Sequence, residues 1–364
     1  METLQRENDL FQPNDLSRLK PELIKVSDAR LCQEIGLVLR TAYDVLDLSA
    51  IEVCRVAGAN IVSQNLLVRL GDRMNFLKCR RGIGAQPRLA EEATLATRVL
   101  ERGVRAPRVI RSNSGAFVTV LNETCWVLFD FQDGSYFRGE GRELDSAAEQ
   151  FGKLTKAAQE LAQGSSCQPA ASELVFLEEL EGLLAEIAAA RHLDPAVTNL
   201  CTRHRHVILK HLQDVRAHRS VVEAEAMLLH LDYHPMNLLM DYGEVACILD
   251  FEDVKVYPVL AALGWGAYKL IRQMMVLPEI RAQEFRSPSL VNRWLSGWHM
   301  SFPEARVSHT ALGLGARYRL LAIIHGILEA YVRRGDERSN YDLAKQLGSF
   351  DEIDVIFGER CRFD

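Results

Sequence analysis

Three polar side chains in the second half of the chain have types and spacing that could position a hydroxyl beside a bound metal ion. Asp232 lies two residues after His230, and Asn237 follows five residues later. Asp250 ends the apolar run 245–249. A carboxylate on a loop, such as Asp232, can orient a hydroxyl group and accept its proton. The oxygens of Asn237 and Asp250 are hard ligands suited to Mg²⁺ that is held mainly by phosphates.

A β-hairpin is expected to bring the two oxygen ligands together. Asn237 opens the run 237–240, whose other residues are apolar, and residues 245–249 are apolar. Both runs read as short strands, and residues 240–244 contain turn-forming residues. Because the strands of a hairpin are antiparallel, Asn237 and Asp250 would lie at the same end of it.

The first part of the chain predicts strands around one helix, and this arrangement could bind phosphates. Lys78 lies between apolar neighbours in a strand, and Glu91 and Glu92 begin the following helix. A strand lysine is usually a solvated residue, and locally that interpretation is about as good as a phosphate-binding one. The expected elements are a helix at 27–43, strands at 50–56, 66–70 and 74–79, a helix at 87–102, and a hairpin of 116–121 with 125–131.

The loop 56–65 contains Gly58 and could lie over phosphates with its backbone N–H groups. It has one glycine where a strict phosphate-binding loop has three, so taken alone it indicates an ordinary turn. Its interpretation therefore depends on the motifs further along the chain.

The pattern changes from β-rich to helical near residues 131–135, which predicts two lobes. We expect an N-terminal arm at 1–26, a β-rich nucleotide-binding lobe at 27–132, and a helical lobe at 133–364 that carries the catalytic loop and the substrate site. The expected helices of the second lobe are 145–162, 171–192, 196–222, 261–275, 289–300, 311–334 and a segment at 341–347.

Composition and charge favour a soluble cytoplasmic protein. The net charge of −6 argues against nucleic-acid binding. The eight cysteines are scattered without a C-x-x-C pair, and several lie in apolar runs, as expected of buried thiols in a reducing compartment. The apolar run 257–270 is too short to span a membrane and contains Lys269. The oligomeric state is left open.

Two groups of imidazole or aromatic side chains could form a ligand-binding site, but a structural role is the better interpretation for each group. His204, His211 and His218 recur every seven residues, so they share a helix face but lie too far apart to chelate one zinc ion. Trp294 and Trp298 are four residues apart and could form an aromatic box for a quaternary amine, although core packing is the better interpretation.

With these motifs in place, the chain resembles the superfamily of aminoglycoside phosphotransferases and choline kinases between about residues 50 and 275. The catalytic and metal segments are specific, and the glycine loop is not. The segments that carry the resemblance are 63–68, 76–78, 92–95, 101–109, 230–237 in the form H-x-D-x-H-P-x-N, and 248–253.

The resemblance implies an α+β, bilobal, protein-kinase-like fold, with a small antiparallel sheet and one helix in the first lobe and a larger helical second lobe. It implies transfer of the γ-phosphoryl group of ATP to a hydroxyl of a small molecule, with Mg²⁺. The implied roles are catalytic base for Asp232, Mg²⁺ ligands for Asn237 and Asp250, phosphate contact for Lys78 held by Glu92, nucleotide binding at Gly58 and Asn65, bracing of the loop by His230, and a supporting acid at Glu252.

Two departures separate the chain from protein kinases. Leu231 stands where they have arginine and where the resembled family usually has glycine, and Glu252 stands where protein kinases have the glycine of their metal loop. The acceptor could be an aminoglycoside, choline or another amino alcohol, homoserine or a sugar. The alternative is a non-catalytic, kinase-like protein that binds a nucleotide.

Overall fold

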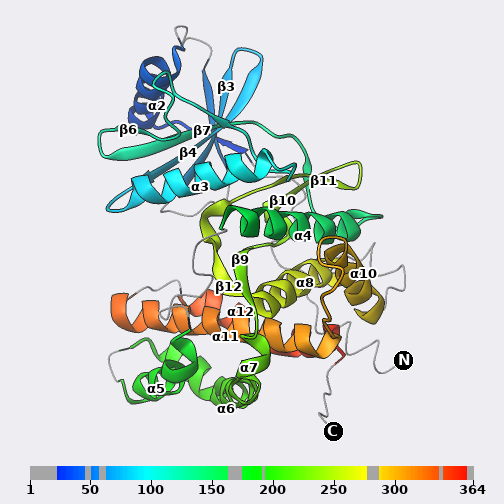
Figure 1. Cartoon of the computed structure of the whole chain (residues 1–364). Helices are drawn as coiled ribbons and strands as arrows, with labels where there is room; N and C mark the ends of the chain where they lie inside the picture. Colours follow the sequence, from blue (N-terminus) through cyan, green and yellow to red (C-terminus); the bar gives the residue numbers. More distant parts are fainter. Residues whose placement is uncertain are drawn as a thin grey trace. The chain divides into compact units, whose positions relative to one another are not determined.

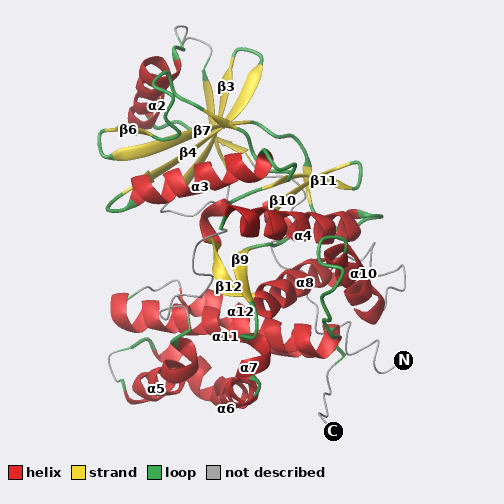
Figure 2. Cartoon of the chain, in the orientation of Figure 1, coloured by secondary structure: helices red, strands yellow, loops and turns green. Residues whose placement is uncertain are grey.

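The computed structural model describes residues 23–45, 51–56, 63–162, 174–190, 193–276, 287–335 and 339–358. Its contacts divide the chain into two compact units. The first contains the described residues up to Phe137 together with Pro235–Asp253, and the second contains Arg138–His234 and the chain from Val254 onward. The segment 235–253, placed by sequence in the helical lobe, thus belongs to the β-rich unit. The fold is α+β, as predicted (Figures 1 and 2).

An antiparallel sheet forms the centre of the first unit. Its strands follow the order β1-β2-β3-β4-β7-β5, and β6 also pairs with β7. The bounds are β1 (Leu23–Lys25), β2 (Glu52–Val56), β3 (Ser63–Leu70), β4 (Arg73–Arg81), β5 (Val109–Ile110), β6 (Thr119–Leu121) and β7 (Thr124–Asp130). Strand β1 lies within the predicted N-terminal arm, whose residues 1–22 are outside the described part of the chain.

Two helices, α2 (Ala29–Tyr43) and α3 (Ala85–Leu100), cover opposite faces of this sheet. Side chains of a strand alternate between faces, and β7 shows it: Trp126 packs in the core with α2, whereas Val127 packs in the core with α3. In β4, Leu77 joins the α2 core, so the neighbouring Lys78 points to the face of α3.

A hairpin of β10 (Leu238–Asp241) and β11 (Glu244–Ile248) completes the first unit, and β10 also pairs with β8 (Ser135–Tyr136). Tyr242 and Gly243 form the two-residue turn with φ of 48° and 79°. Positive φ at both central residues is the geometry of a type I′ turn, which matches the twist of paired strands.

The second unit is mainly helical, with one pair of antiparallel strands. Strands β9 (Ala226–His230) and β12 (Val254–Pro258) pair with each other, and Val254 lies opposite His230. This strand pair therefore holds together the two ends of the segment that contributes residues 235–253 to the first unit. The helices are α4 (Glu143–Leu161), α5 (Phe176–Ala189), α6 (Pro195–Ala217), α7 (Arg219–Val222), α8 (Val259–Val276), α10 (Ser287–His299), α11 (His309–Arg334) and α12 (Ser339–Ile356).

Aromatic side chains fill the core between α4 and α10. Trp294 and Trp298 are buried, and their rings lie 5.5 Å and 5.8 Å from the ring of Phe151. The prediction of core packing for both tryptophans is therefore confirmed. His211 is also buried, and its ring stacks on Phe350 at 4.4 Å.

Helix α11 is long and apolar enough to cross a membrane by length and composition, a feature that the sequence interpretation overlooked. In the structure 67% of its apolar window is buried inside the protein, as expected of a core helix. It packs against α8, where a Cβ atom on Gly315 would collide with the Leu260 carbonyl and one on Gly264 with the Leu312 carbonyl. The two glycines thus allow the helix backbones to approach closely.

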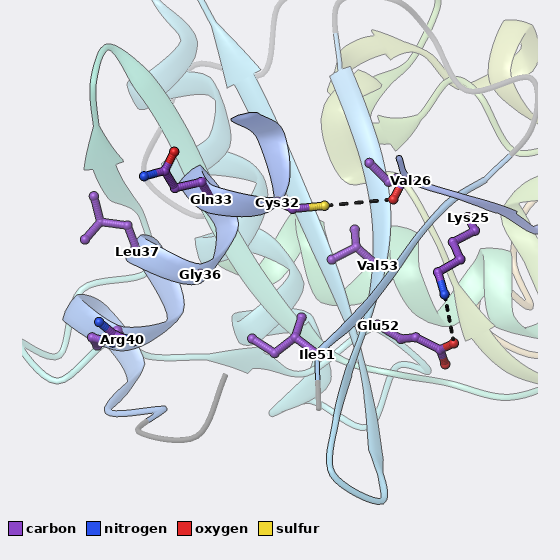
Figure 3. A pocket seen from close by; sticks show the side chains of 10 residues that line it. All are labelled: Lys25, Val26, Cys32, Gln33, Gly36, Leu37, Arg40, Ile51, Glu52 and Val53. Carbon is purple, nitrogen blue, oxygen red and sulfur yellow. Dashed lines mark hydrogen bonds and ion pairs between the residues drawn. The ribbon is translucent and has the colours of Figure 1, made fainter. Parts of the chain in front are cut away.

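Figure 3 shows a pocket of about 500 Å³ on the face of the sheet that α2 covers. Its walls come from α2 and from residues of β1 and β2, with Leu37 and Ile51 among the apolar side chains and Arg40 at one end. None of the predicted nucleotide-binding or metal-binding residues that the structure describes lines this pocket.

Candidate active site

The Lys78 ammonium is the centre of a buried charge cluster in the first unit. Its Nζ lies 2.9 Å and 3.0 Å from the two carboxylate oxygens of Glu92, 3.0 Å from Asp250 and 2.5 Å from Glu252. Glu92 is buried and Glu91 is exposed, so α3 presents to Lys78 the acid that the resemblance selected. One ammonium group therefore contacts three carboxylates.

The sequence explains this convergence through strand alternation and helix periodicity. Lys78 points to the face of the sheet that α3 covers, and Glu92 lies on the buried stripe of α3 between Leu89 and Ala93. Arg80, two residues beyond Lys78 on β4, points the same way and pairs with Glu252.

Burial and charge act in opposite directions on the groups of this cluster. Burial raises the pKa of the Glu92 carboxyl, and the positive charge of Lys78 opposes that effect. Burial lowers the pKa of the Arg80 guanidinium, while Glu92 and Asp250 raise it. The cluster holds more negative charge than Lys78 can neutralise.

Asn237 and Asp250 lie at the open end of the β10–β11 hairpin, as the sequence predicts. The Leu249 N–H donates to the Asn237 carbonyl at 2.8 Å, which holds the two ends of the hairpin together. Asp250 has a left-handed backbone conformation with φ of 58°. Non-glycine residues rarely adopt this conformation, and such strain gathers at functional sites.

The donor set fits a divalent cation. Oxygens of Glu92, Asp250 and Glu252 lie within 4.8 Å of one another. Glu92 is buried and bound by Lys78, whereas the Asp250 side chain also contacts Lys78 but is 41% exposed and so accessible to a ligand. Hard carboxylate oxygens with surplus negative charge are the ligands that Mg²⁺ prefers, so these residues match the cofactor that the resemblance implies.

Gly58 and Asn65, both in the predicted loop 56–65, are the other two residues predicted to bind the nucleotide. Gly58 lies outside the described residues. Asn65 lies on β3 directly opposite Lys78, and its side-chain oxygen is buried without a hydrogen-bond partner among the described residues. A buried acceptor without a donor is costly, so Asn65 offers a polar atom beside Lys78 that a ligand could satisfy.

Asp232 belongs to the second unit, on the loop that follows β9. Its backbone N–H donates to Nδ1 of the buried His230 at 3.3 Å, so that ring nitrogen is unprotonated. The Asp232 carboxylate lies 3.3 Å from Nε2 of His234. Tyr233 is fully buried, and its hydroxyl donates to the Ala147 carbonyl at 2.7 Å, which anchors the loop to α4. The loop is therefore fixed on both sides of Asp232.

The environment of Asp232 favours the ionised carboxylate. Burial raises its pKa, but neighbouring imidazole and ammonium groups outweigh burial and lower it, with His234 first and then His230 and Lys269. An ionised carboxylate can accept a hydrogen bond from a hydroxyl group.

Sequence reasoning gave no role to three residues that the structure brings into these clusters. Arg80 could have been found from its position two residues after Lys78. His234 is part of the H-x-D-x-H motif and contacts Asp232. Lys269 lies far along the chain on α8, and no local signal links it to Asp232.

A family model described as the phosphotransferase enzyme family (APH) matches residues 54–296, more than half of the chain. The chain belongs to the phosphotransferase enzyme family. The match contains Lys78, Glu92, Asp232, Asn237 and Asp250. The predicted superfamily and the predicted enzyme class, a small-molecule phosphotransferase, are therefore confirmed. A search of curated proteins found no match.

Solved structures of phosphotransferases share the fold. Spectinomycin phosphotransferase APH(9)-Ia, in complex with ADP and spectinomycin, has a TM-score of 0.63 at 14% identity, covering 89% of this chain and 97% of that one. Macrolide 2'-phosphotransferase MphH from Brachybacterium faecium has a TM-score of 0.53 at 14% identity, covering 86% and 95%. Choline kinase from Cryptosporidium parvum has a TM-score of 0.51 at 11% identity, covering 89% and 92%. These similarities confirm the predicted protein-kinase-like fold of this family member.

Proposed function

We propose that this phosphotransferase moves the γ-phosphoryl group of ATP, with Mg²⁺, to a hydroxyl of a small molecule. The observation that carries the proposal is the Lys78 ammonium held by Glu92 beside the partly exposed carboxylate of Asp250. A strand lysine fixed by a helix glutamate, next to a metal-binding acid, is the arrangement by which kinases hold nucleotide phosphates. Relatives of the same fold were solved with ADP and AMP, which supports a nucleotide as donor.

Each residue has a defined task in this proposal. Lys78 contacts the phosphates, and Asn65 and Gly58 lie along the nucleotide. Asn237 and Asp250 hold Mg²⁺, which neutralises charge on the phosphates when it is bound. Asp232, braced by His230, orients the acceptor hydroxyl and takes its proton. Glu252 supports the metal ligands through its contacts with Lys78 and Arg80.

The acceptor classes that fit the scaffold are aminoglycosides, choline and other amino alcohols, homoserine and sugars, because fold does not fix the substrate. We also propose that the protein acts in the cytoplasm. The described cysteines are free thiols, and those predicted to be buried, Cys79, Cys125 and Cys247, are buried, which suits a reducing compartment.

A coupled ADP-release screen over hydroxyl-bearing metabolites and aminoglycosides tests the activity. With the acceptor that it identifies, Asp232→Asn should lower kcat by about 100-fold or more while leaving the Kd for ATP unchanged, because the amide cannot accept the proton. Wild-type turnover by Asp232→Asn would show that the assignment of the base is wrong. Absence of nucleotide binding by the wild-type protein would contradict the proposed function as a whole.

A further inference from the structure

Lys269 on α8 is a half-buried lysine whose ammonium lies against aromatic rings. Its Nζ is 4.3 Å from the ring centroid of Trp265 and 5.3 Å from that of Tyr268. Among the residues that the structure describes, no carboxylate forms an ion pair with it. The ammonium thus contacts ring faces, which bind cations more weakly than a partner carboxylate does in a buried site.

The surroundings of Lys269 are rich in positive charge. Burial, together with the charges of Lys345 and Arg272, lowers its pKa to about 7. Asp232 and Glu352 act in the opposite direction. Burial alone disfavours an ammonium group, and two further cations add to that effect.

Arg272 lies three residues beyond Lys269 on α8, and its guanidinium is only partly satisfied. Its Nε donates to Glu352 at 2.7 Å. Its Nη1 is buried and has no hydrogen-bond partner within the described part of the chain. The same Glu352 also accepts from the Tyr268 hydroxyl at 2.5 Å. Glu352 is therefore already shared by two other groups, and no carboxylate of the described residues forms an ion pair with Lys269.

Asp232 and Lys269 belong to the same unit, and α8 passes beside the loop that carries Asp232: a Cβ atom on Gly266, three residues before Lys269, would lie 3.8 Å from the ring of Tyr233. Each of the two charged groups also changes the pKa of the other. When the hydroxyl of an acceptor binds to Asp232, the other groups of that acceptor would therefore interact electrostatically with Lys269. A cationic acceptor would be repelled there. The ring faces of Trp265 and Tyr268, which could bind an ammonium group, already hold the protein's own ammonium.

We propose that the acceptor of this enzyme carries an anionic group, a carboxylate or a phosphate, near its reacting hydroxyl, and that Lys269 binds that group. The inference rests on the proposed function for the place of the hydroxyl at Asp232. An anion would form a direct ion pair with Lys269 and would supply hydrogen-bond acceptors for the cationic groups around it. An acceptor with an anionic group would not be an aminoglycoside, because aminoglycosides are polycationic.

Binding of matched three-carbon diols to the full-length protein tests the proposal without requiring turnover. The probes are glycerate with a carboxylate, glycerol 3-phosphate with a phosphate, glycerol with no charge, and 3-amino-1,2-propanediol with an ammonium group. Affinities are measured by ligand-observed NMR at about pH 6, below the pKa of Lys269. At least one anionic probe should bind about tenfold more tightly than the neutral and cationic ones.

Variants then test the part played by Lys269. Lys269→Met keeps an unbranched chain against Trp265 but removes the charge, and it should weaken anion binding about tenfold. Lys269→Arg should retain that binding. Lys210→Met, which removes an exposed lysine from α6, should match the wild type. Equal or tighter binding of the amine, no binding of either anion, or unchanged anion binding by Lys269→Met would each overturn the proposal.

ADP release separates this outcome from failure of the proposed function. If only the phosphotransferase assignment is wrong, the anion still binds to the wild type and not to Lys269→Met, while no acceptor promotes ADP release. If only the anion assignment is wrong, ADP release occurs with neutral or cationic acceptors, and KM for them does not change in Lys269→Met. If both are right, Lys269→Met raises KM for an anionic acceptor and leaves the Kd for ATP unchanged.

Discussion

Asp250 combines a strained backbone with a charged side chain. Its φ of 58° is left-handed, and its carboxylate lies 3.0 Å from the Lys78 ammonium. For residues other than glycine this conformation costs about 1 kcal/mol or more. The chain leaves β11 just before Asp250, and the Asp250 side chain lies in the charge cluster. A strained backbone at this position supports a role that only a carboxylate can fulfil.

Replacing Asp250 separates the backbone effect from the chemical one. Asp250→Gly and Asp250→Ala should both abolish ADP release, because each removes the proposed metal ligand. The glycine variant should nevertheless be about 1 kcal/mol more stable to urea than the alanine variant, since glycine accepts a positive φ without strain. Equal unfolding free energies for the two variants would show that the left-handed conformation of Asp250 is not strained.

At the scale of elements, α3 and β4 position the lysine and glutamate of the site. Glu92→Gln removes the charge that holds the Lys78 ammonium, and we expect kcat/KM for ATP to fall about tenfold or more. Glu91→Gln is the matched control, because Glu91 is the exposed neighbour on the same helix. Its kinetics should equal those of the wild type. If both variants lost the same activity, helix stability rather than the Lys78–Glu92 pair would explain the loss.

The packing of α8 against α11 depends on two small residues rather than on side-chain chemistry. Gly315→Ala would place a methyl group against the Leu260 carbonyl, and the unfolding free energy should fall by about 2 kcal/mol. Gly326→Ala on the same helix meets no atom within 4 Å and should be neutral or stabilising by up to about 1 kcal/mol. Similar destabilisation by both substitutions, measured in urea, would contradict the close approach.

Elements with a strong local period could be predicted from the sequence, and those made by distant pairing could not. Helix α3 and strands β4 and β11 were found close to their observed bounds, because their apolar residues repeat with a helix or strand period. Strands β1, β9 and β12 were not predicted, since each is short and depends on a partner strand far away along the chain. The predicted helix 196–222 is divided at His218, whose φ and ψ of −111° and 18° are not helical.

The same limit applies to the candidate site. Asp232, Asn237 and Asp250 could be predicted because they lie in one short segment, with the order and spacing of a catalytic base followed by two metal ligands. The choice of Glu92 over Glu91 needed the family resemblance. Lys269 could not be predicted at all, because only the packing of α8 in the second unit brings its charge within reach of Asp232.

At the scale of the whole molecule, the chain order and the compact units do not coincide. The segment Pro235–Asp253 leaves the helical unit and completes the β-rich one, so Asn237 and Asp250 join Lys78 there. The paired strands β9 and β12 hold the two ends of this segment together. A cut of the chain near residue 132 would therefore separate Lys78 and Glu92 from Asp250 and Glu252.

Stability of the whole protein in acid should depend on the buried His211. Burial lowers the pKa of its imidazole from 6.5 to about 4, with a further contribution from Arg317. As pH falls from about 6.5 toward 4, the unfolded chain takes up a proton that the folded protein does not, so the free energy of unfolding decreases. For this single group the loss between pH 7 and about pH 4.5 is about 2.5 kcal/mol.

His211→Phe keeps a ring against Phe350 and removes the titrating group, so its loss of unfolding free energy over the same pH range should be smaller by about 2.5 kcal/mol. Urea denaturation at the two pH values measures this difference. Carboxylates with lowered pKa, such as Asp232, also reduce stability in acid, but they act equally in both proteins and cancel in the comparison. His206→Phe, an exposed position on the same helix, should lose as much stability as the wild type. The same loss in all three proteins would mean that His211 takes up its proton in the folded state as readily as in the unfolded chain.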